Sequence, residues 1–177
     1  MKVVMITGSA HKHGTTATLA DKFEQGVKDA GHEFFRFDAA FKSVHSCIAC
    51  DKCHEDGECV FHADDMKTLN PYLLEADVVV FVSPIYYFTI NAQIKAVIDR
   101  FYANDDALQG GKKAVLITAM ADTEISAASG ADATFDEMLK YLNWGNAGVL
   151  NAKNATVASD LSEEDLASAY DLGRNLK

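Results

Sequence analysis

The stretch KVVMITGSAHKHGTT, residues 2–16, predicts how the chain begins to fold. Residues 2–7 form a nearly continuous apolar run, which is typical of a strand buried on both faces of a parallel sheet. Gly8 and Ser9 end this run, and apolar side chains at helical spacing follow from about Thr15. We therefore expect a buried strand, a short loop and a helix, the unit from which alternating α/β domains are built.

The same alternation continues along the chain. Further strand-like apolar runs lie at residues 34–37, 77–83, 113–118 and 149–158. Segments with helical periodicity lie between most of them, and strands that are apolar throughout imply a parallel sheet covered by helices on both faces. The sequence therefore predicts a three-layer, doubly wound α/β domain with a five-stranded parallel sheet, spanning residues 1–177.

The composition limits the classes of function. The chain has 177 residues, 49% of them hydrophobic, which suits one domain with a substantial core. The 26 acidic residues against 16 basic ones give a net charge of −10, which disfavours nucleic acids and anionic membrane surfaces as partners. The sequence shows no secretory signal pattern and no apolar run long enough to span a bilayer, so we expect a cytoplasmic protein.

The loop over residues 8–16 has the composition of a phosphate-binding loop. Backbone N–H groups at the start of a helix bind phosphate, and Ser and Thr hydroxyls add further donors. A P-loop has a lysine directly before its Ser or Thr, but here Gly14 precedes Thr15. The dinucleotide fingerprint has a glycine two positions after its first glycine, but here that position is Ala10. Two interpretations remain, a hydroxyl-rich phosphate loop or an ordinary strand–helix turn with capping residues.

A second loop, SPIYYF at residues 83–88, follows the third predicted strand. In doubly wound sheets ligands bind beyond the carboxyl ends of the strands. Three consecutive aromatic residues at such an end cannot all point into the core. They suit a flat conjugated ligand, and the alternatives are a hydrophobic turn or a contact between subunits.

All four cysteines lie in a third region, residues 39–63, the one long stretch without periodicity. They are Cys47, Cys50, Cys53 and Cys59. Thiols stay reduced in the cytosol, so four clustered cysteines indicate metal or redox chemistry rather than a disulfide framework. A loop of this length within one domain is usually functional.

The order of the motifs resembles the family of NADPH-dependent FMN reductases and iron–sulfur flavoproteins. The resemblance is carried by GSxHxxGTT from Gly8 and by SPIYYFxxxAQxKxxIDR from Ser83, and it extends to about residue 120. It implies a flavodoxin-like fold with strand order 2-1-3-4-5 and bound FMN. It also implies assembly into a homodimer or homotetramer.

The resemblance assigns the cofactor-binding residues. The phosphate of FMN would be held by Ser9, His11, Thr15 and Thr16, although the family commonly has a basic residue at the position of His11. The isoalloxazine ring would be held by Pro84, Ile85, Tyr86, Tyr87 and Phe88. A third loop would complete the site with Ala119, Met120 and Asp122.

The cysteine spacing, C-x2-C-x2-C-x5-C, resembles the compact motif of iron–sulfur flavoproteins, which bind a [4Fe–4S] cluster. Such tight spacing lets three thiolates converge on one cuboidal cluster, and a fourth thiolate closes it. Zinc sites usually separate two ligand pairs by about a dozen residues or more. Zinc, free thiols and a disulfide stay open as alternatives to the cluster.

These motifs together predict an FMN-dependent oxidoreductase. Electrons would come from NAD(P)H or ferredoxin and would reduce a flavin, a quinone or another small molecule. The flavin would carry the chemistry, so no side chain is predicted to be catalytic. The alternative is a non-catalytic electron carrier, or a redox or metal sensor built on the cysteines.

Overall fold

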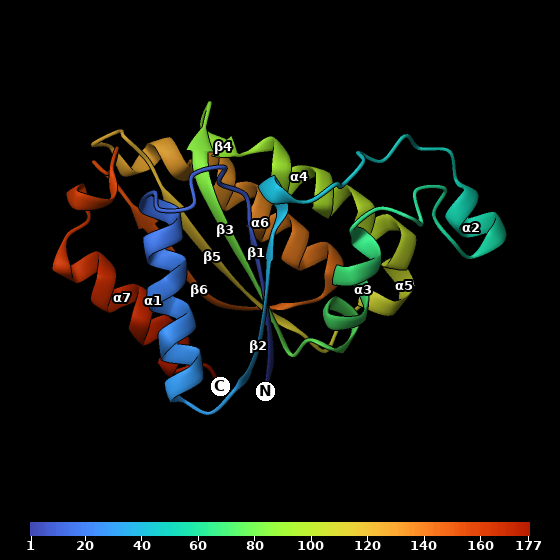
Figure 1. Ribbon diagram of the computed structural model, residues 1–177, viewed down its shortest axis with the longest axis horizontal. Coiled ribbons are helices and arrows are strands. Elements are labelled where there is room, and N and C mark those ends of the chain that lie inside the picture. Colours follow the sequence, from blue (N-terminus) through green and yellow to red (C-terminus); the bar gives the residue numbers. More distant parts are fainter.

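Six strands form one sheet at the centre of the computed structural model, which describes residues 1–177 (Figure 1). The strands are β1 (Lys2–Thr7), β2 (Glu33–Asp38), β3 (Val78–Tyr86), β4 (Thr89–Ile90), β5 (Lys113–Ala119) and β6 (Gly145–Ala152). The sheet order is β2-β1-β3-β5-β6 and all of these pairs are parallel. The short strand β4 pairs antiparallel with the end of β3.

Seven α-helices complete the chain. They are α1 (Thr15–Asp29), α2 (Lys52–Asp56), α3 (Met66–Glu75), α4 (Ala92–Asp99), α5 (Asp105–Leu108), α6 (Ser129–Leu142) and α7 (Glu163–Arg174). Figure 1 shows α1 and α7 side by side on one face of the sheet, with α3, α4 and α6 on the other. A capping box between Ser162 and Asp165 begins α7.

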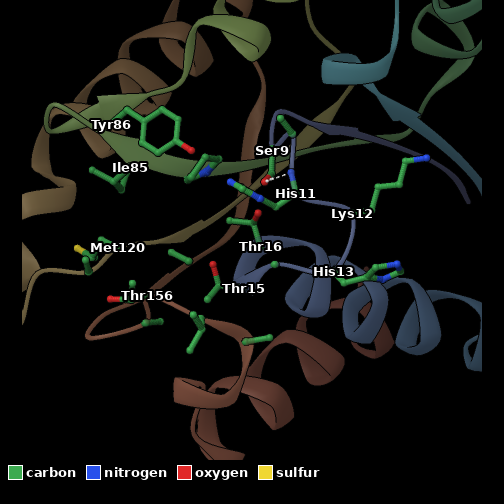
Figure 2. A pocket seen from close by; sticks show the side chains of 18 residues that line it. Ser9, His11, Lys12, His13, Thr15, Thr16, Ile85, Tyr86, Met120 and Thr156 are labelled. Carbon is green, nitrogen blue, oxygen red and sulfur yellow. Dashed lines mark hydrogen bonds between the residues drawn. The ribbon is translucent and has the colours of Figure 1, made fainter.

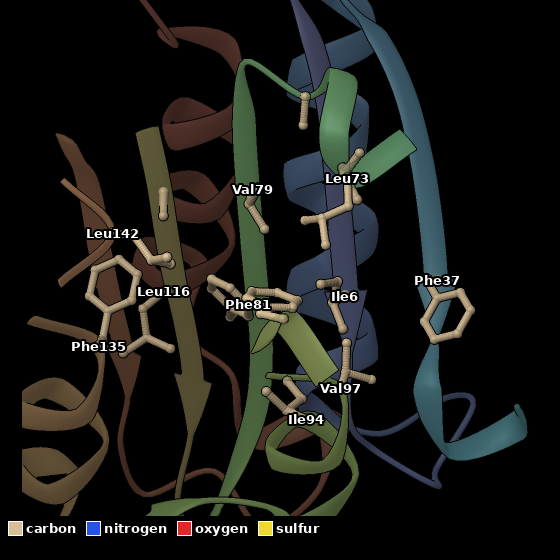
Figure 3. Packing of buried hydrophobic residues seen from close by; sticks show 14 of the residues in the cluster. Ile6, Phe37, Leu73, Val79, Phe81, Ile94, Val97, Leu116, Phe135 and Leu142 are labelled. Carbon is tan, nitrogen blue, oxygen red and sulfur yellow. The ribbon is translucent and has the colours of Figure 1, made fainter. Parts of the chain in front are cut away.

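The two faces of the sheet bury separate apolar clusters. Alternate side chains of a strand point to opposite faces, so Val4 and Ile6 join a cluster of 22 residues under α3, α4 and α6 (Figure 3). Val3 and Met5 join a second cluster of 17 residues under α1 and α7. Burial on both faces explains why the central strands read as continuous apolar runs.

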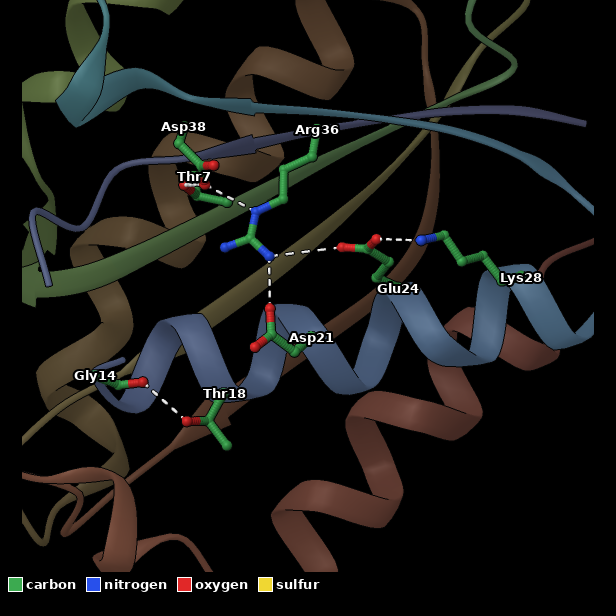
Figure 4. A network of polar contacts seen from close by, with 8 residues as sticks. All are labelled: Thr7, Gly14, Thr18, Asp21, Glu24, Lys28, Arg36 and Asp38. Carbon is green, nitrogen blue, oxygen red and sulfur yellow. Dashed lines mark hydrogen bonds and ion pairs between the residues drawn. The ribbon is translucent and has the colours of Figure 1, made fainter. Parts of the chain in front are cut away.

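Arg36 on β2 forms ion pairs that connect α1 to the edge of the sheet. Its guanidinium pairs with Asp21 at 2.6 Å and with Glu24 at 3.6 Å on α1, and with Asp38 at 2.8 Å (Figure 4). Asp38 also accepts a hydrogen bond from the hydroxyl of Thr7, the last residue of β1, at 2.7 Å. The network therefore connects α1 and the carboxyl ends of β1 and β2 at the point where the first loop leaves the sheet.

The predicted fold class is confirmed, and so is the predicted strand order when the five long strands are numbered along the chain. The predicted count of five strands is wrong, because the two-residue strand β4 adds a sixth. The last predicted strand, residues 149–158, is also misplaced, since β6 begins at Gly145. Its first half contains two glycines and an extra residue, Ala147, where the register against β5 shifts, and this weakens the apolar pattern.

Residues 39–63 contain little regular structure. A 3-10 turn at Ala39–Phe41 and the short helix α2 are the only helical pieces, and Figure 1 shows α2 projecting beyond the helices that cover the sheet. None of the helices has both the length and the apolar character that a membrane-spanning helix requires.

Candidate functional site

A pocket of about 700 Å³ lies at the carboxyl ends of β1, β3, β5 and β6 (Figure 2). Its walls come from four segments at or beyond the strand ends, residues 9–16, 84–86, 119–121 and 155–158. Residues 84–86 still belong to β3, and Ala119 is the last residue of β5. The volume lies within the usual range for small-molecule and cofactor sites. The strand order reverses between β1 and β3, and a ligand of a doubly wound sheet binds at such a switch point.

The first loop presents donors to this pocket. Gly14 is the N-cap of α1 and has no side chain to cap the helix, so the N–H groups of the first turn are left for a ligand. The hydroxyl of Ser9 accepts the N–H of His11 at 3.1 Å, which folds the loop back on itself. Figure 2 shows the side chains of Thr15 and Thr16 directed towards the middle of the pocket.

Asn91, the N-cap of α4, binds the first two loops together. Its side-chain amide donates to the carbonyl of Gly8 at 2.5 Å and accepts the N–H of Ile94 at 3.4 Å. Its backbone N–H donates to the hydroxyl of Ser83 at 3.0 Å. Asn91 is only 2% exposed, and a Cβ at Gly8 would overlap its side chain, which explains the glycine at that position.

The loop predicted at residues 83–88 contains a tight hairpin turn within its three aromatic residues. Ile85 pairs with Ile90, and Tyr86 pairs with Thr89, so Tyr87 and Phe88 form a two-residue turn with φ values of 48° and 67°. Positive φ at both positions matches the turn that usually carries Asn-Gly. The side chain of Tyr87 is 97% exposed, which shows that the turn points it into solvent.

The pocket contains most of the residues that the sequence proposes for the cofactor. Ser9, His11, Thr15, Thr16, Pro84, Ile85, Tyr86, Ala119 and Met120 line it. Tyr87, Phe88 and Asp122 do not line it. Asp122 instead holds its own loop, because its carboxylate accepts the N–H of Glu124 at 2.9 Å and its carbonyl accepts the N–H of Asn154 at 2.8 Å.

The fourth wall, residues 155–158, is not among the residues that the sequence predicts for the site. This loop follows β6, and the carboxyl ends of parallel strands lie at one edge of a sheet. A correct end for the last strand at Ala152 would have placed Thr156 at the pocket. The backbone N–H of Ala155 donates to the carbonyl of Met120 at 2.8 Å, which ties this loop to the third one.

The four cysteines lie together, away from this pocket. All of them line one hollow of about 20 Å³, together with Arg100 and Tyr102. All four are free thiols. Burial raises the pKa of the Cys53 thiol, and the nearby charges of Cys59 and Cys47 raise it further. We call residues 43–65, which carry the cysteines, the cysteine segment.

The thiols suit an iron–sulfur cluster in kind, although the hollow has room for little more than one water molecule. No three His, Cys, Asp or Glu side chains are placed to hold a single metal ion. A cuboidal cluster is larger than one ion, and each of its irons takes one thiolate, so its ligands stand further apart. Cluster binding would require the exposed tip of the segment to open around it.

Fold and pocket together define a doubly wound domain with a nucleotide-type site at its switch point. The chain belongs to the NADPH-dependent FMN reductase family, because residues 1–160 match the sequence model of that family. This family comprises FMN-dependent reductases that use NAD(P)H, so the protein is an oxidoreductase. The resemblance seen in the two loops is therefore confirmed.

Individual relatives agree with this assignment. An iron–sulfur flavoprotein of Archaeoglobus fulgidus is 30% identical over 99% of this chain and 79% of its own length. One from Methanocaldococcus jannaschii is 33% identical, but the alignment covers 56% of this chain and 51% of that protein. Among solved structures, the NAD(P)H:quinone oxidoreductase of Methanothermobacter marburgensis superposes with a TM-score of 0.77 at 18% identity, covering 98% of this chain and 94% of that one. At 18% identity, the similarity to the Methanothermobacter marburgensis structure shows a shared fold only.

The turn at Tyr87 and Phe88 stores backbone strain. A residue other than glycine in the left-handed region costs about 1–2 kcal/mol, and Asn and Gly tolerate it best. Replacing Tyr87→Asn and Phe88→Gly together should therefore raise the free energy of unfolding by about 1–2 kcal/mol in urea titrations. Tyr87→Phe keeps the strain and should leave stability unchanged. A loss of stability in the double variant would show that the aromatic side chains contribute more than the turn costs.

Proposed function

We propose that the protein binds FMN in the switch-point pocket and transfers electrons from NAD(P)H to a quinone or another small acceptor. The observation that carries this proposal is the pocket itself. It joins the uncapped start of α1 and a hydroxyl-rich loop to a wall formed by Pro84, Ile85, Tyr86 and Met120. A ligand with a phosphate at one end and a flat apolar ring at the other fits both parts.

The proposed phosphate site lies within residues 9–16. Hydroxyls of Ser9, Thr15 and Thr16 and the free N–H groups of α1 are the donors. The protein has a net charge of −10, yet this loop contains Lys12 and two histidines and no carboxylate. The local charge therefore suits a phosphate even though the protein as a whole repels anions.

The proposed ring site lies between residues 84–86 and 119–121. Bound FMN would supply a group that accepts a hydride and passes on its electrons. The chain's own residues would orient the ring. The overall reaction balances as NAD(P)H, one proton and a quinone giving NAD(P)⁺ and the hydroquinone. The quinone is suggested by the name of the Methanothermobacter marburgensis protein.

We also propose that the cysteine segment holds a [4Fe–4S] cluster through Cys47, Cys50, Cys53 and Cys59. Four thiols facing one hollow are the donor set that such a cluster takes. The backbone N–H of Ala49 lies 3.5 Å from the sulfur of Cys47 and donates to it, a contact of the kind that tunes cluster potentials. The names of the Archaeoglobus and Methanocaldococcus relatives also support this proposal.

Homodimer or homotetramer formation remains part of the proposal. Its support is the hairpin tip, where Tyr87 is 97% and Phe88 62% exposed. Exposed aromatic side chains on a strained turn are unfavourable in a monomer, and aromatic residues are enriched at subunit interfaces.

The phosphate site can be tested with a matched pair of threonine variants. Thr15→Val removes a hydroxyl from the pocket and should weaken FMN binding about 10- to 100-fold, since a hydrogen bond to a charged group contributes about 1.5–3 kcal/mol. The control is Thr18→Val. Its hydroxyl, one helical turn further on, donates to the carbonyl of Gly14 at 3.0 Å and does not line the pocket. Quenching of FMN fluorescence gives both Kd values, and equal values would place the phosphate elsewhere.

Steady-state turnover tests the reaction. The FMN-loaded protein should oxidise NADH or NADPH with benzoquinone as acceptor, one quinone per nucleotide, followed by the loss of nicotinamide absorbance. Protein that turns over with neither nucleotide, while its flavin is reduced by ferredoxin, would be an electron carrier instead. Protein that takes up no FMN at all would overturn both assignments.

The cluster can be tested separately from the flavin. Anaerobic incubation with equal amounts of ferrous and ferric iron and with sulfide should load about four irons and four sulfides per chain and add a broad absorbance beneath the flavin bands. Cys50→Ala should lose most of this iron and keep the flavin bands. Ser46→Ala, an exposed position in the same segment, should behave as the unchanged protein. Full iron content in Cys50→Ala would exclude that cysteine as a ligand.

A further inference from the structure

Asp64 and Arg100 form the one ion pair whose two side chains are both buried, each 3% exposed, with 2.6 Å between Nη1 of Arg100 and Oδ2 of Asp64. Neither residue lines the switch-point pocket. Burying two charges costs desolvation energy, and an apolar pair of similar volume would stabilise a protein at least as well. A buried pair at this place therefore points to a need for defined geometry rather than for stability.

The pair holds both ends of the cysteine segment. Nη1 of Arg100 also donates to the carbonyl of His45 at 2.9 Å, and Nη2 donates to the carbonyl of Phe61 at 3.4 Å. The carboxylate of Asp64 accepts the N–H of His45 at 3.1 Å and that of Met66 at 3.0 Å. Arg100 lies directly after α4, so the incoming and outgoing parts of the segment are bound to one another and to the core.

These contacts lie next to the thiols. His45 precedes Cys47 by two residues, and Phe61 follows Cys59 by two residues. Arg100 is itself a wall of the hollow that the four cysteines share, and its Nε is buried without a hydrogen-bond partner. Arg100 therefore helps to set the separation of the backbones that carry Cys47 and Cys59. It acts beside two hydrogen bonds between Ser43 and Asp65, at 2.7 and 2.8 Å, and the stacking of His45 on Phe61.

Arg100 begins a 3-10 turn, Arg100–Asn104, and this turn also holds the tip of the segment. The hydroxyl of Tyr102 donates to the carboxylate of Asp51 at 3.1 Å, and its ring packs against His54 at 4.4 Å between centroids. Both of these contacts are exposed, whereas the Asp64–Arg100 pair is not. The tip is therefore held by solvent-exposed contacts, which are weaker than the buried contacts at the base.

We propose that Asp64 and Arg100 are positioning residues for the cysteine centre. They hold the two ends of the segment at a fixed separation, so that the thiols converge on a cluster when the tip opens. The inference about the cluster rests on the function proposed above, whereas the positioning of the thiols does not depend on it.

The experiment uses variants of the full chain that separate positioning from folding. Arg100→Met alone leaves the carboxylate of Asp64 buried without a partner, so it is paired with Asp64→Leu, which removes both charges. Arg100→Lys keeps the charge but lacks the planar fork that contacts several acceptors at once. Lys95→Met is the matched control, because it removes a cation of α4 whose partner, Asp99, is exposed. FMN content and thermal unfolding report whether each variant folds.

The first measurement needs no cluster. In a Cys50→Ala/Cys53→Ala background, dibromobimane bridges Cys47 and Cys59, each sulfur displacing one bromide, and the product fluoresces. The bridging rate should fall at least about tenfold in Asp64→Leu/Arg100→Met, because displaced reacting groups lose effective concentration. Arg100→Lys should be intermediate, and Lys95→Met should match the unchanged segment. An unaltered rate in the double variant would overturn the positioning role.

The second measurement loads iron and sulfide into chains that keep all four cysteines. The affinity for iron should fall about 10- to 100-fold in Asp64→Leu/Arg100→Met, the usual effect of losing a residue that orients metal ligands. Wild-type affinity and an unchanged cluster potential in this variant would also overturn the proposal. If the parent chain takes up no iron, while bridging is fast in it and slow in the double variant, the cluster proposal fails and the positioning of the thiols stands.

Discussion

The side chain of Asn91 is the interaction on which the candidate site depends. It joins the end of β1, the end of β3 and the start of α4 inside a region that excludes water, since Asn91 is 2% exposed and Ser83 is fully buried. Each of the bonded groups would otherwise be an unsatisfied polar group in the core, which is costly. The phosphate-type loop and the aromatic loop therefore hold their relative position through one amide, and the absence of a side chain at Gly8 lets it come that close.

Much of the site could be predicted because parallel strands end at one edge of a sheet. Residues at or just beyond the carboxyl end of a strand, such as Ser9, Tyr86 and Ala119, reach the pocket wherever the strand end is located correctly. The loop at residues 155–158 was missed for the converse reason, because the last strand was predicted to run through it. The sequence does not show that Tyr87 and Phe88 lie outside the pocket, because nothing in the run of aromatic residues marks a tight turn. The usual Asn-Gly signal is missing, and the turn forms in spite of its strain.

The cysteine segment shows a different limit of prediction from the sequence. The spacing of the thiols along the chain is visible in the sequence, whereas the groups that hold the segment come from elsewhere. Arg100 is about forty residues away from the segment's last cysteine and belongs to a motif that reads as an ordinary amphipathic helix with a Lys95–Asp99 pair. No local sequence pattern indicates that this arginine is buried against Asp64, because the contact depends on the tertiary packing of α4.

Helix α4 therefore connects the two candidate sites of the molecule. Its N-cap, Asn91, fixes the two loops of the switch-point pocket, and the residue that follows its last turn, Arg100, fixes the base of the cysteine segment. The helix has eight residues, which corresponds to about 12 Å at 1.5 Å per residue. It also packs into the apolar cluster beneath the sheet through Ile94 and Val97, which are fully buried. A short helix anchored in this way holds the base of the cysteine segment in a fixed position relative to the switch-point pocket.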